Sequence, residues 1–169
     1  MYKQANEGTA RIYWLDDGIA SIGLRPYIVY GPSRDQGMTS QPTKAMLAAA
    51  LGRPHNILFG GRAVYQYTED AARAFIQAAR SPFEGADAFN LGGSIAHMSE
   101  IVAGIEVAAP TSRGQITFDD KPLPFPAEMD GAPLEAAIGP IRHTPLAEGI
   151  SATVALFRSA SGSGRLVID

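Results

Sequence analysis

The sequence predicts an α/β fold, and two observations support this prediction. Helical and strand-like patterns alternate along most of the 169 residues. The segment 21–30 is also apolar on both faces, as expected of an interior strand in a parallel sheet. The length suits one domain with its own core, and no change of composition divides the chain.

The first part of the chain reads as a helix over residues 3–17, because apolar side chains recur at helical spacing and Gly18 follows as a stop signal. The strand 21–30 comes next. Downstream, two more helices are expected over about 40–52 and 69–80, the later one capped by Thr68. Short strands are expected over residues 56–60, 64–68 and 88–92.

In the second half of the chain, a helix is expected to start at His97–Glu100 and to end near residue 109. His97 is a weaker cap than Ser or Thr, although Glu100 can complete a capping box. A last helix should follow Thr144 and Pro145, its N-cap and first residue. Between them lie a predicted strand over 115–119 and a short helix over about 133–138. Residues 1–159 then form the folded part, and the Ser- and Gly-rich segment 160–169 is expected to be a flexible tail.

Composition excludes several classes of function. The net charge of −3, with no basic cluster longer than a pair, argues against a nucleic-acid partner. The absence of cysteine excludes disulfides, thiolate metal sites and a cysteine nucleophile. The three histidines are too scattered to predict a metal site. No apolar stretch is long enough to span a membrane and the N-terminus is not a signal peptide, so a cytoplasmic protein is expected.

Two segments near the start carry a family resemblance: Lys3 with the residues after it, and the run Arg-Pro-Tyr-Ile-Val-Tyr-Gly-Pro at 25–32. Together they resemble the extended short-chain dehydrogenase/reductases, the NAD-dependent sugar epimerase/dehydratase family. There a Tyr-x-x-x-Lys pair opens a long helix, and an Arg-Pro-x-x-x-Tyr-Gly-Pro strand end follows. The resemblance, which runs to about Ser159, implies a partial Rossmann-like fold. We expect the C-terminal, substrate-side portion, without the N-terminal dinucleotide-binding half.

In this register Lys3 corresponds to the family's catalytic lysine. Residues four apart share a helix face, so the ammonium group lies near the phenol of the paired tyrosine and lowers its pKa. The tyrosine then acts as general acid or base, and the resemblance implies that the lysine also reaches the nicotinamide ribose. That tyrosine belongs four residues before Lys3, where the sequence has no residue. Tyr2 points about 100° away from Lys3, so we expect the chain to begin inside the active site.

The family's cofactor, NAD or NADP, is expected not to bind this chain alone. Dinucleotide binding relies on a glycine-rich turn between a strand and a helix, which brings the pyrophosphate onto the helix N-terminus. The 169 residues contain no G-x-G-x-x-G or G-x-x-G-x-x-G motif in that setting. By resemblance, Pro26, Tyr27 and Val29 lie against the nicotinamide, with Lys3 at the ribose.

Three residues are candidates for contacts with the substrate. Asn6 is expected to share a face with Lys3, with an exposed polar role equally compatible. Arg34 and Arg62 are candidates for an anionic substrate, although surface ion pairs are the simpler interpretation. Relatives that bind sugar nucleotides often have asparagine where Ile28 stands and arginine where Ala63 stands. These two departures argue against a nucleotide-diphosphate sugar, and Asp70 is expected to serve its helix N-terminus.

Three functions stay open at this point. The chain is expected to be the substrate-binding portion of an NAD(P)-dependent epimerase/dehydratase-like protein for a sugar-like substrate, inactive alone. It could instead be one half of a split enzyme completed by another chain, or a non-catalytic binding or assembly module. Because the strand 21–30 would leave apolar surface uncovered, a homo-oligomer, most simply a dimer, is also expected.

Overall fold

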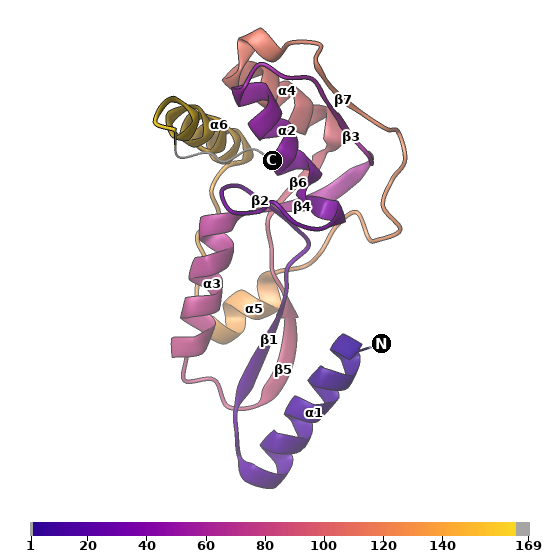
Figure 1. The fold of residues 1–169 in the computed structure, drawn as a ribbon. Coiled ribbons are helices and arrows are strands. Elements are labelled where there is room, and N and C mark those ends of the chain that lie inside the picture. The colour runs from indigo at the N-terminus through magenta and orange to yellow at the C-terminus, as the bar shows by residue number, and fades with distance from the viewer. Residues whose placement is uncertain (1, 165–169) are drawn as a thin grey trace.

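Three small β-sheets organise the protein in the computed structural model, which describes residues 2–164 (Figure 1). The helices are α1 (Tyr2–Asp17), α2 (Gln41–Ala50), α3 (Thr68–Arg80), α4 (Met98–Ala108), α5 (Ala132–Ile138) and α6 (Leu146–Gly162). Two 3-10 turns, η1 (Met38–Ser40) and η2 (Pro110–Ser112), lie beside α2 and α4. No helix in the described range is both long and apolar enough to cross a membrane.

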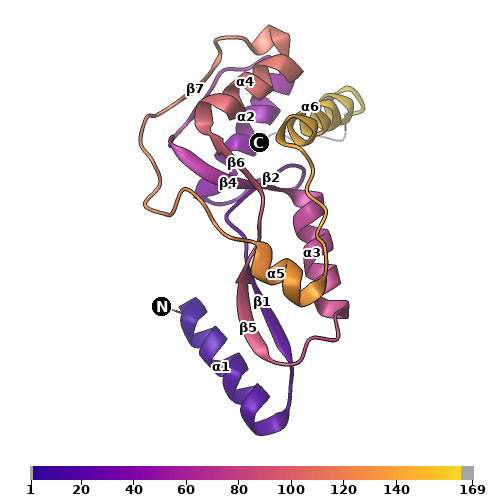
Figure 2. The same ribbon diagram turned by 180° about the vertical axis from the view of Figure 1, so that it is seen from behind.

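One sheet is a parallel pair of β1 (Ser21–Arg25) and β5 (Ala86–Asn90), in which Gly23 is opposite Ala88. Helix α1 lies along one face of this pair, and α3 and α5 lie on the other, as the front and back views show (Figures 1 and 2). Side chains from β1 and β5 pack with α3 and α5 in a small core around Ala74, Leu91 and Leu134. These elements form the elongated lower part of the molecule.

The main core belongs to the second sheet. Strand β4 (Arg62–Tyr67) pairs in parallel with β2 (Ile28–Tyr30) and antiparallel with β6 (Ser94–His97). Helices α2, α4 and α6 pack around this sheet, and the fully buried side chains include Ile28, Tyr30, Met46, Tyr65, Ile101, Ile105 and Ile150. The third sheet, a parallel pair of β3 (His55–Ile57) and β7 (Ile116–Phe118), extends this upper part.

The expected continuous strand over 21–30 is wrong. The chain leaves the β1–β5 pair after Arg25 and enters the β2–β4–β6 sheet at Ile28. Proline has no N–H and cannot donate to a ladder, so Pro26 is a physical reason for the break. The result is one strand in each of two sheets, and only the β2 part lies fully in the main core.

Most helix boundaries lie close to the positions expected from capping and stop residues in the sequence. Gly18, the expected stop of the first helix, has φ 67° and donates its N–H to the Trp14 carbonyl at 3.0 Å. At α4 the capping box forms with His97 as the cap, and Glu100 accepts the His97 N–H at 3.0 Å. Two cap assignments are wrong: Thr68 is already inside α3, and Pro145 rather than Thr144 precedes α6. Strand β6 was not expected at all.

The C-terminal boundary lies later than the sequence suggested. Helix α6 continues to Gly162, three residues into the segment 160–169 that was expected to be a tail. Residues 165–169 of that segment lie outside the described residues.

Candidate active site

The N-terminal helix carries Lys3 in its first turn, exposed and without a described partner. Glu7 follows four residues later, so both side chains rise from the same face of α1. Glu7 accepts two hydrogen bonds from Arg25, from Nε to Oε1 at 2.8 Å and from Nη2 to Oε2 at 2.5 Å. These bonds lower the pKa of Glu7, mainly through the hydrogen bond itself. The two sequence segments that carried the resemblance therefore meet at this ion pair.

A shallow hollow lies between α1 and the β1–β5 pair, and Asn6 faces it. Its volume is about 250 Å³, and it is lined by Asn6, Glu7, Ala10, Ser21, Ile22, Gly23, Ala86, Asp87 and Ala88. Lys3, three residues before Asn6 on the same helix, is not among the lining residues. Both side chains are exposed.

The segment 25–27 crosses from one sheet to the other at the surface. Pro26 is exposed, and Tyr27 is half-buried with its ring edge-on to Phe125 (centroids 5.8 Å apart, planes at 84°). Burial raises the pKa of the Tyr27 phenol, whose oxygen has no described hydrogen-bond partner. Val29 turns instead toward the small core beside α3 and α5. Pro26 is therefore the exposed residue here, whereas the side chains of Tyr27 and Val29 pack against the two cores.

The two candidate arginines lie apart from this segment and from each other. Arg34 donates to the Gln36 carbonyl and, from Nη2, to the Thr39 hydroxyl at 3.0 Å, so it closes its own loop. Arg62 is exposed at the start of β4, where its Nη2 lies 3.8 Å from Glu128 Oε1. The adjacent Ala63 points into the core, in line with the expected reversal of facing after a one-residue shift.

Asp70 lies in the first turn of its helix, as expected, and also has a partner that was not expected. It lies in the first turn of α3 and is buried, and it accepts hydrogen bonds from the Thr144 N–H at 2.5 Å and the Thr144 hydroxyl at 3.1 Å. This carboxylate ties α3 to the segment that leads into α6. The long sequence separation of Asp70 and Thr144 hid the contact from sequence reasoning.

Gln66 is a second residue that sequence reasoning missed. It is 3% exposed in the middle of β4, and its carboxamide bonds to the backbone of Tyr27 and of Leu91. The one available signal was a glutamine within the otherwise apolar run Val64–Tyr67.

The histidines have separate structural partners. His55 Nε2 lies 3.0 Å from Gln41 Oε1, and burial, assisted by Lys44, lowers the pKa of the His55 ring. His97 caps α4, and His143 Nε2 lies 2.8 Å from Glu135 Oε1. Within residues 2–164 no three His, Asp or Glu side chains are grouped as a metal site would require.

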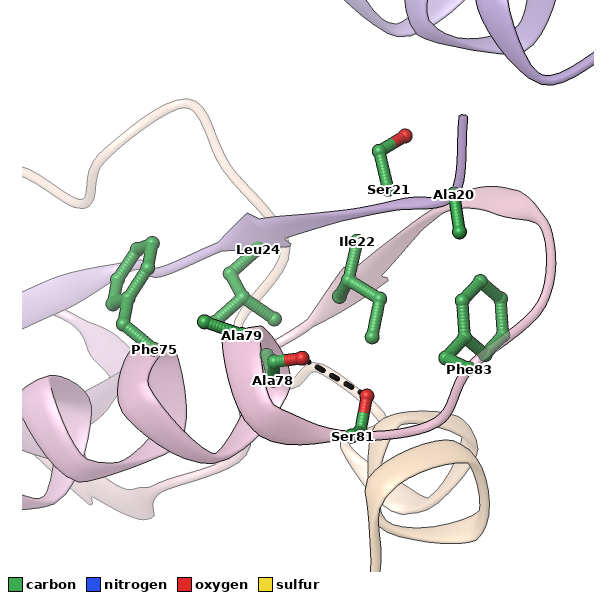
Figure 3. Close-up of a pocket in the computed structure, with 9 residues that line it drawn as sticks. All are labelled: Ala20, Ser21, Ile22, Leu24, Phe75, Ala78, Ala79, Ser81 and Phe83. Atoms are coloured by element: carbon green, nitrogen blue, oxygen red, sulfur yellow. Dashed lines mark hydrogen bonds between the residues drawn. The ribbon is translucent and has the colours of Figure 1, made fainter. Parts of the chain in front are cut away.

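A second hollow, of about 330 Å³, lies between β1 and α3 (Figure 3). Ile22 and Leu24 point from β1 toward Ala78 and Ala79 of α3, and Ser21 points the opposite way. Phe75, Ser81 and Phe83 complete its wall together with Ala20.

The hollow borders an open strand edge. Ser21 donates its N–H to Gly85, and Arg25 accepts from Leu91, so these residues turn their backbone toward β5. Because hydrogen-bonding direction alternates along a strand, the backbone N–H and C=O groups of Ile22 and Leu24 point away from β5. Of the described strands, β1 pairs with β5 alone. The outer edge of β1 and the apolar hollow beside it are therefore both accessible.

A family model matches more than half of the chain, and solved structures share its fold. Residues 1–92 match the family model described as the NAD dependent epimerase/dehydratase family. A partial consensus L-threonine 3-dehydrogenase is similar in structure over 93% of this chain and 55% of its own, with a TM-score of 0.80 and 22% identity. The structure of UDP-glucose 4-epimerase from Thermotoga maritima, solved with UDP-glucose, has a TM-score of 0.79 to this chain. It is 19% identical over 94% of this chain and 52% of its own.

A UDP-glucose 4-epimerase from Thermus thermophilus, solved as a complex with NAD, is 25% identical, with a TM-score of 0.74 over 92% of this chain and 52% of its own. The chain thus spans about half the length of the solved structures that it matches. No curated protein sequence matches it.

Proposed function

The chain belongs to the NAD dependent epimerase/dehydratase family, and from this premise we propose that it supplies the substrate side of an NAD- or NADP-dependent site. In this proposal the 169 residues do not themselves supply a glycine-rich phosphate-binding turn or the paired tyrosine. The observation that carries the proposal is the Arg25–Glu7 ion pair. It joins the helix that bears Lys3 to the strand end that leads into Pro26 and Tyr27.

The residues present fit the nicotinamide-ribose end of a dinucleotide and not its pyrophosphate. Lys3 is exposed and has no described partner that would compete for its ammonium group. Pro26 has no N–H, and the Tyr27 N–H is already donated to Gln66. Outside the strand ladders, no hydrogen bond to the Pro26 or Tyr27 carbonyl is found among the described residues, so these carbonyls would accept from the nicotinamide amide. A bound nicotinamide would supply hydride transfer.

Lys3 has two tasks in this proposal. Its positive charge, one helical turn from the tyrosine, stabilises the phenolate and so prepares a general base. Its ammonium group also orients the ribose through hydrogen bonds. Neither task requires a buried lysine, which agrees with its exposed place at the start of α1.

A substrate without a nucleotide diphosphate suits these residues best. Ile28 is fully buried and Ala63 is 3% exposed, so neither offers a polar group to a ligand. Arg34 is engaged within its loop, and Arg62 lies beside Glu128. We therefore assign a small, hydroxyl-bearing, sugar-like substrate and keep Asn6 as its polar candidate; Arg34 and Arg62 have other partners.

A split enzyme is the second candidate, and the open edge of β1 favours it. Ile22 and Leu24 have outward backbone groups, and an apolar hollow lies beside them. A strand from another chain could pair there and bring the nucleotide-binding turn with it. In a non-catalytic module, the same surface would bind a partner without any cofactor.

The test compares the chain alone with a completed protein. NADH fluorescence should show no saturable binding in the micromolar range for the 169 residues alone, and a micromolar isotherm would contradict the proposal. A nucleotide-binding half from a family member, fused before Met1 or added as a separate chain, should give turnover that Lys3→Ala abolishes. Lys44→Ala on α2 is the matched control and should keep that turnover. Completed protein that folds and binds NADH without turnover would favour the non-catalytic module.

A further inference from the structure

Two of the connections between the lower and upper parts of the molecule lie at the same level. Strand β1 ends at Arg25 and β2 begins at Ile28, while β5 ends at Asn90 and β6 begins at Ser94. Figure 1 shows both connections running side by side between the two sheets. The backbone ladders stop here, so peptide groups in the crossing need other partners.

The side chain of Gln66 provides those partners. Its Oε1 accepts the Tyr27 N–H at 2.8 Å, and its Nε2 donates to the Leu91 carbonyl at 2.6 Å. Leu91 in turn donates its N–H to the Arg25 carbonyl at 3.2 Å, which closes a ring of hydrogen bonds. A carboxamide offers a carbonyl acceptor and N–H donors, the same kinds of group that a peptide uses in a sheet, so Gln66 replaces a missing backbone hydrogen-bond pair between the two connections.

The surroundings of Gln66 are shaped for this role. Gln66 is 3% exposed and Leu91 is 2% exposed, so water does not readily replace the carboxamide. A Cβ on Gly93 would lie 2.9 Å from Gln66 Cγ and 2.5 Å from the Tyr65 carbonyl oxygen. A glycine at position 93 therefore leaves the space that the Gln66 side chain fills.

We propose that Gln66 is a positioning residue that holds the segment 25–27 against the segment 91–93 and so fixes where Pro26 and Tyr27 lie. What those two residues would contact rests on the proposed function. The lock itself does not, because it consists of contacts within this chain. Gln66 acts through the backbone of Tyr27 and has no ligand contact of its own.

The experiment measures amide hydrogen exchange by NMR in the 169-residue chain. Gln66→Leu keeps the approximate volume and removes both hydrogen bonds. Exchange at the Tyr27 amide, which loses its acceptor, should rise by about tenfold or more, as expected when a buried hydrogen bond is lost. Exchange at the Leu91 amide should rise as well, because its bond to the Arg25 carbonyl is no longer supported by the neighbouring Gln66 contact. Amides of Ile101 and Ile105 in the core of α4 serve as the reference for global unfolding and should change less.

Gln77→Leu is the matched control. Gln77 also uses its carboxamide to bind backbone, at the carbonyls of Ile138 (2.9 Å) and Pro140 (3.1 Å), but it lies between α3 and α5. Its loss should leave the Tyr27 amide protected. If Gln66→Leu and Gln77→Leu gave the same exchange at Tyr27 and Leu91, the proposal would be overturned.

Gln66→Glu gives a second, reversible test, which also serves if Gln66→Leu does not fold. A protonated carboxyl can accept from Tyr27 and donate to Leu91, whereas a carboxylate cannot donate. Burial raises the pKa of such a group, so the variant should match the parent protein near about pH 5. Toward about pH 8 the carboxylate should repel the Leu91 carbonyl, which weakens the neighbouring bond from the Leu91 N–H to Arg25 and lowers the protection of the Leu91 amide. Equal protection at both pH values would refute the lock. Failure of the NADH or turnover experiments would leave these exchange results unaffected.

Discussion

Arg25 and Glu7 form a two-pronged ion pair, with Nε to Oε1 at 2.8 Å and Nη2 to Oε2 at 2.5 Å. The pair joins α1 to the end of β1. It matters because α1 has no buried residue within the described structure, so little apolar packing holds this helix in place. Bidentate arginine–carboxylate pairs fix orientation as well as distance. The orientation of Lys3 toward the rest of the site therefore depends on Glu7.

Replacing Glu7 with glutamine should loosen α1 without unfolding the core. We expect faster hydrogen exchange in α1 and little change at Ile101 and Ile105. Added salt should speed exchange in α1 of the parent protein and have less effect on the variant, because the ion pair is screened. Glu69→Gln, which removes a pair with Arg73 inside one helix, is the control. Equal α1 protection in Glu7→Gln and the parent would contradict this account.

The same pair gives a pH dependence of known sign. Arg25 lowers the pKa of Glu7 in the folded protein, so the folded state binds fewer protons than the unfolded state in that range. The stabilisation is then present above the ordinary glutamate pKa of about 4.3 and is lost as pH falls through the lowered value. Protection of α1 in the parent should decline on acidification toward that of Glu7→Gln. A constant difference between them down to about pH 2 would show that the charge is irrelevant.

Gly149 should not tolerate a side chain. A Cβ at this position in α6 would overlap the Tyr30 hydroxyl, so Gly149→Ala should destabilise the protein by about 1–3 kcal/mol in spite of the better helix propensity of alanine. Gly8→Ala in α1, where no atom lies within 4 Å, should be neutral or slightly stabilising. Denaturant unfolding measures both.

Tyr30→Phe provides the check on that explanation. The Tyr30 hydroxyl is buried and has no described hydrogen-bond partner, so its removal alone should be tolerated. Combined with Gly149→Ala, it should recover much of the lost stability. If the changes in the free energy of unfolding caused by Tyr30→Phe and Gly149→Ala simply added in the double variant, the clash with the Tyr30 hydroxyl would not be the cause of the destabilisation.

His55 should make the protein less stable in mild acid. Burial, assisted by Lys44, lowers the pKa of its ring in the folded state, so unfolded chains take up a proton more readily. The contribution of neutral His55 to the free energy of unfolding is fully present above the ordinary histidine pKa of about 6.5. It is lost as pH falls through the lowered pKa of the folded state. His55→Gln should remove this part of the pH dependence, as thermal unfolding over that range can measure. Lys44→Met should raise the His55 pKa in an NMR titration, and an unchanged pKa would contradict the role of Lys44.

The 169-residue chain is expected to self-associate, most simply as a twofold dimer. The edge of β1 is open, and α1 exposes Ile12, Tyr13 and Leu15 by 60%, 53% and 69%. Such apolar surface beside an unpaired strand favours association. Sedimentation at micromolar concentration should detect the dimer, and Leu15→Lys should weaken it. Leu156→Lys on α6 is the control, and a stable monomer of the parent chain would refute the expectation.

The elements that were predicted well depend on signals close together in sequence. Helix α1 was expected over 3–17 and α3 over 69–80, within one residue of their observed bounds. Their apolar spacing and the flanking Gly18 and Pro82 are local features, so no distant partner was needed. The family likewise followed from two short segments near the N-terminus.

The errors arose where pairing decided the outcome. The run 21–30 is mostly apolar on both faces, which suits one long strand as well as two short ones. Which of these forms depends on β5 and β4, the strands that pair with its two halves, both more than thirty residues away in sequence. The missed strand β6 has the same cause, since its short run Ser94–His97 becomes a strand by pairing with β4.

By itself, then, the sequence determined the helices, the family resemblance and the chemical candidates at Lys3, Pro26 and Tyr27. Only the tertiary structure decided which contacts hold these candidates in place. The helix that bears Lys3 is held by the bond from Arg25 to Glu7, and Tyr27 is held by Gln66. The physical reason is the range of the interactions. Backbone propensity and side-chain periodicity act within one or two helical turns, whereas these hydrogen bonds join residues 18 and 39 positions apart, and such contacts exist only after the sheets have paired.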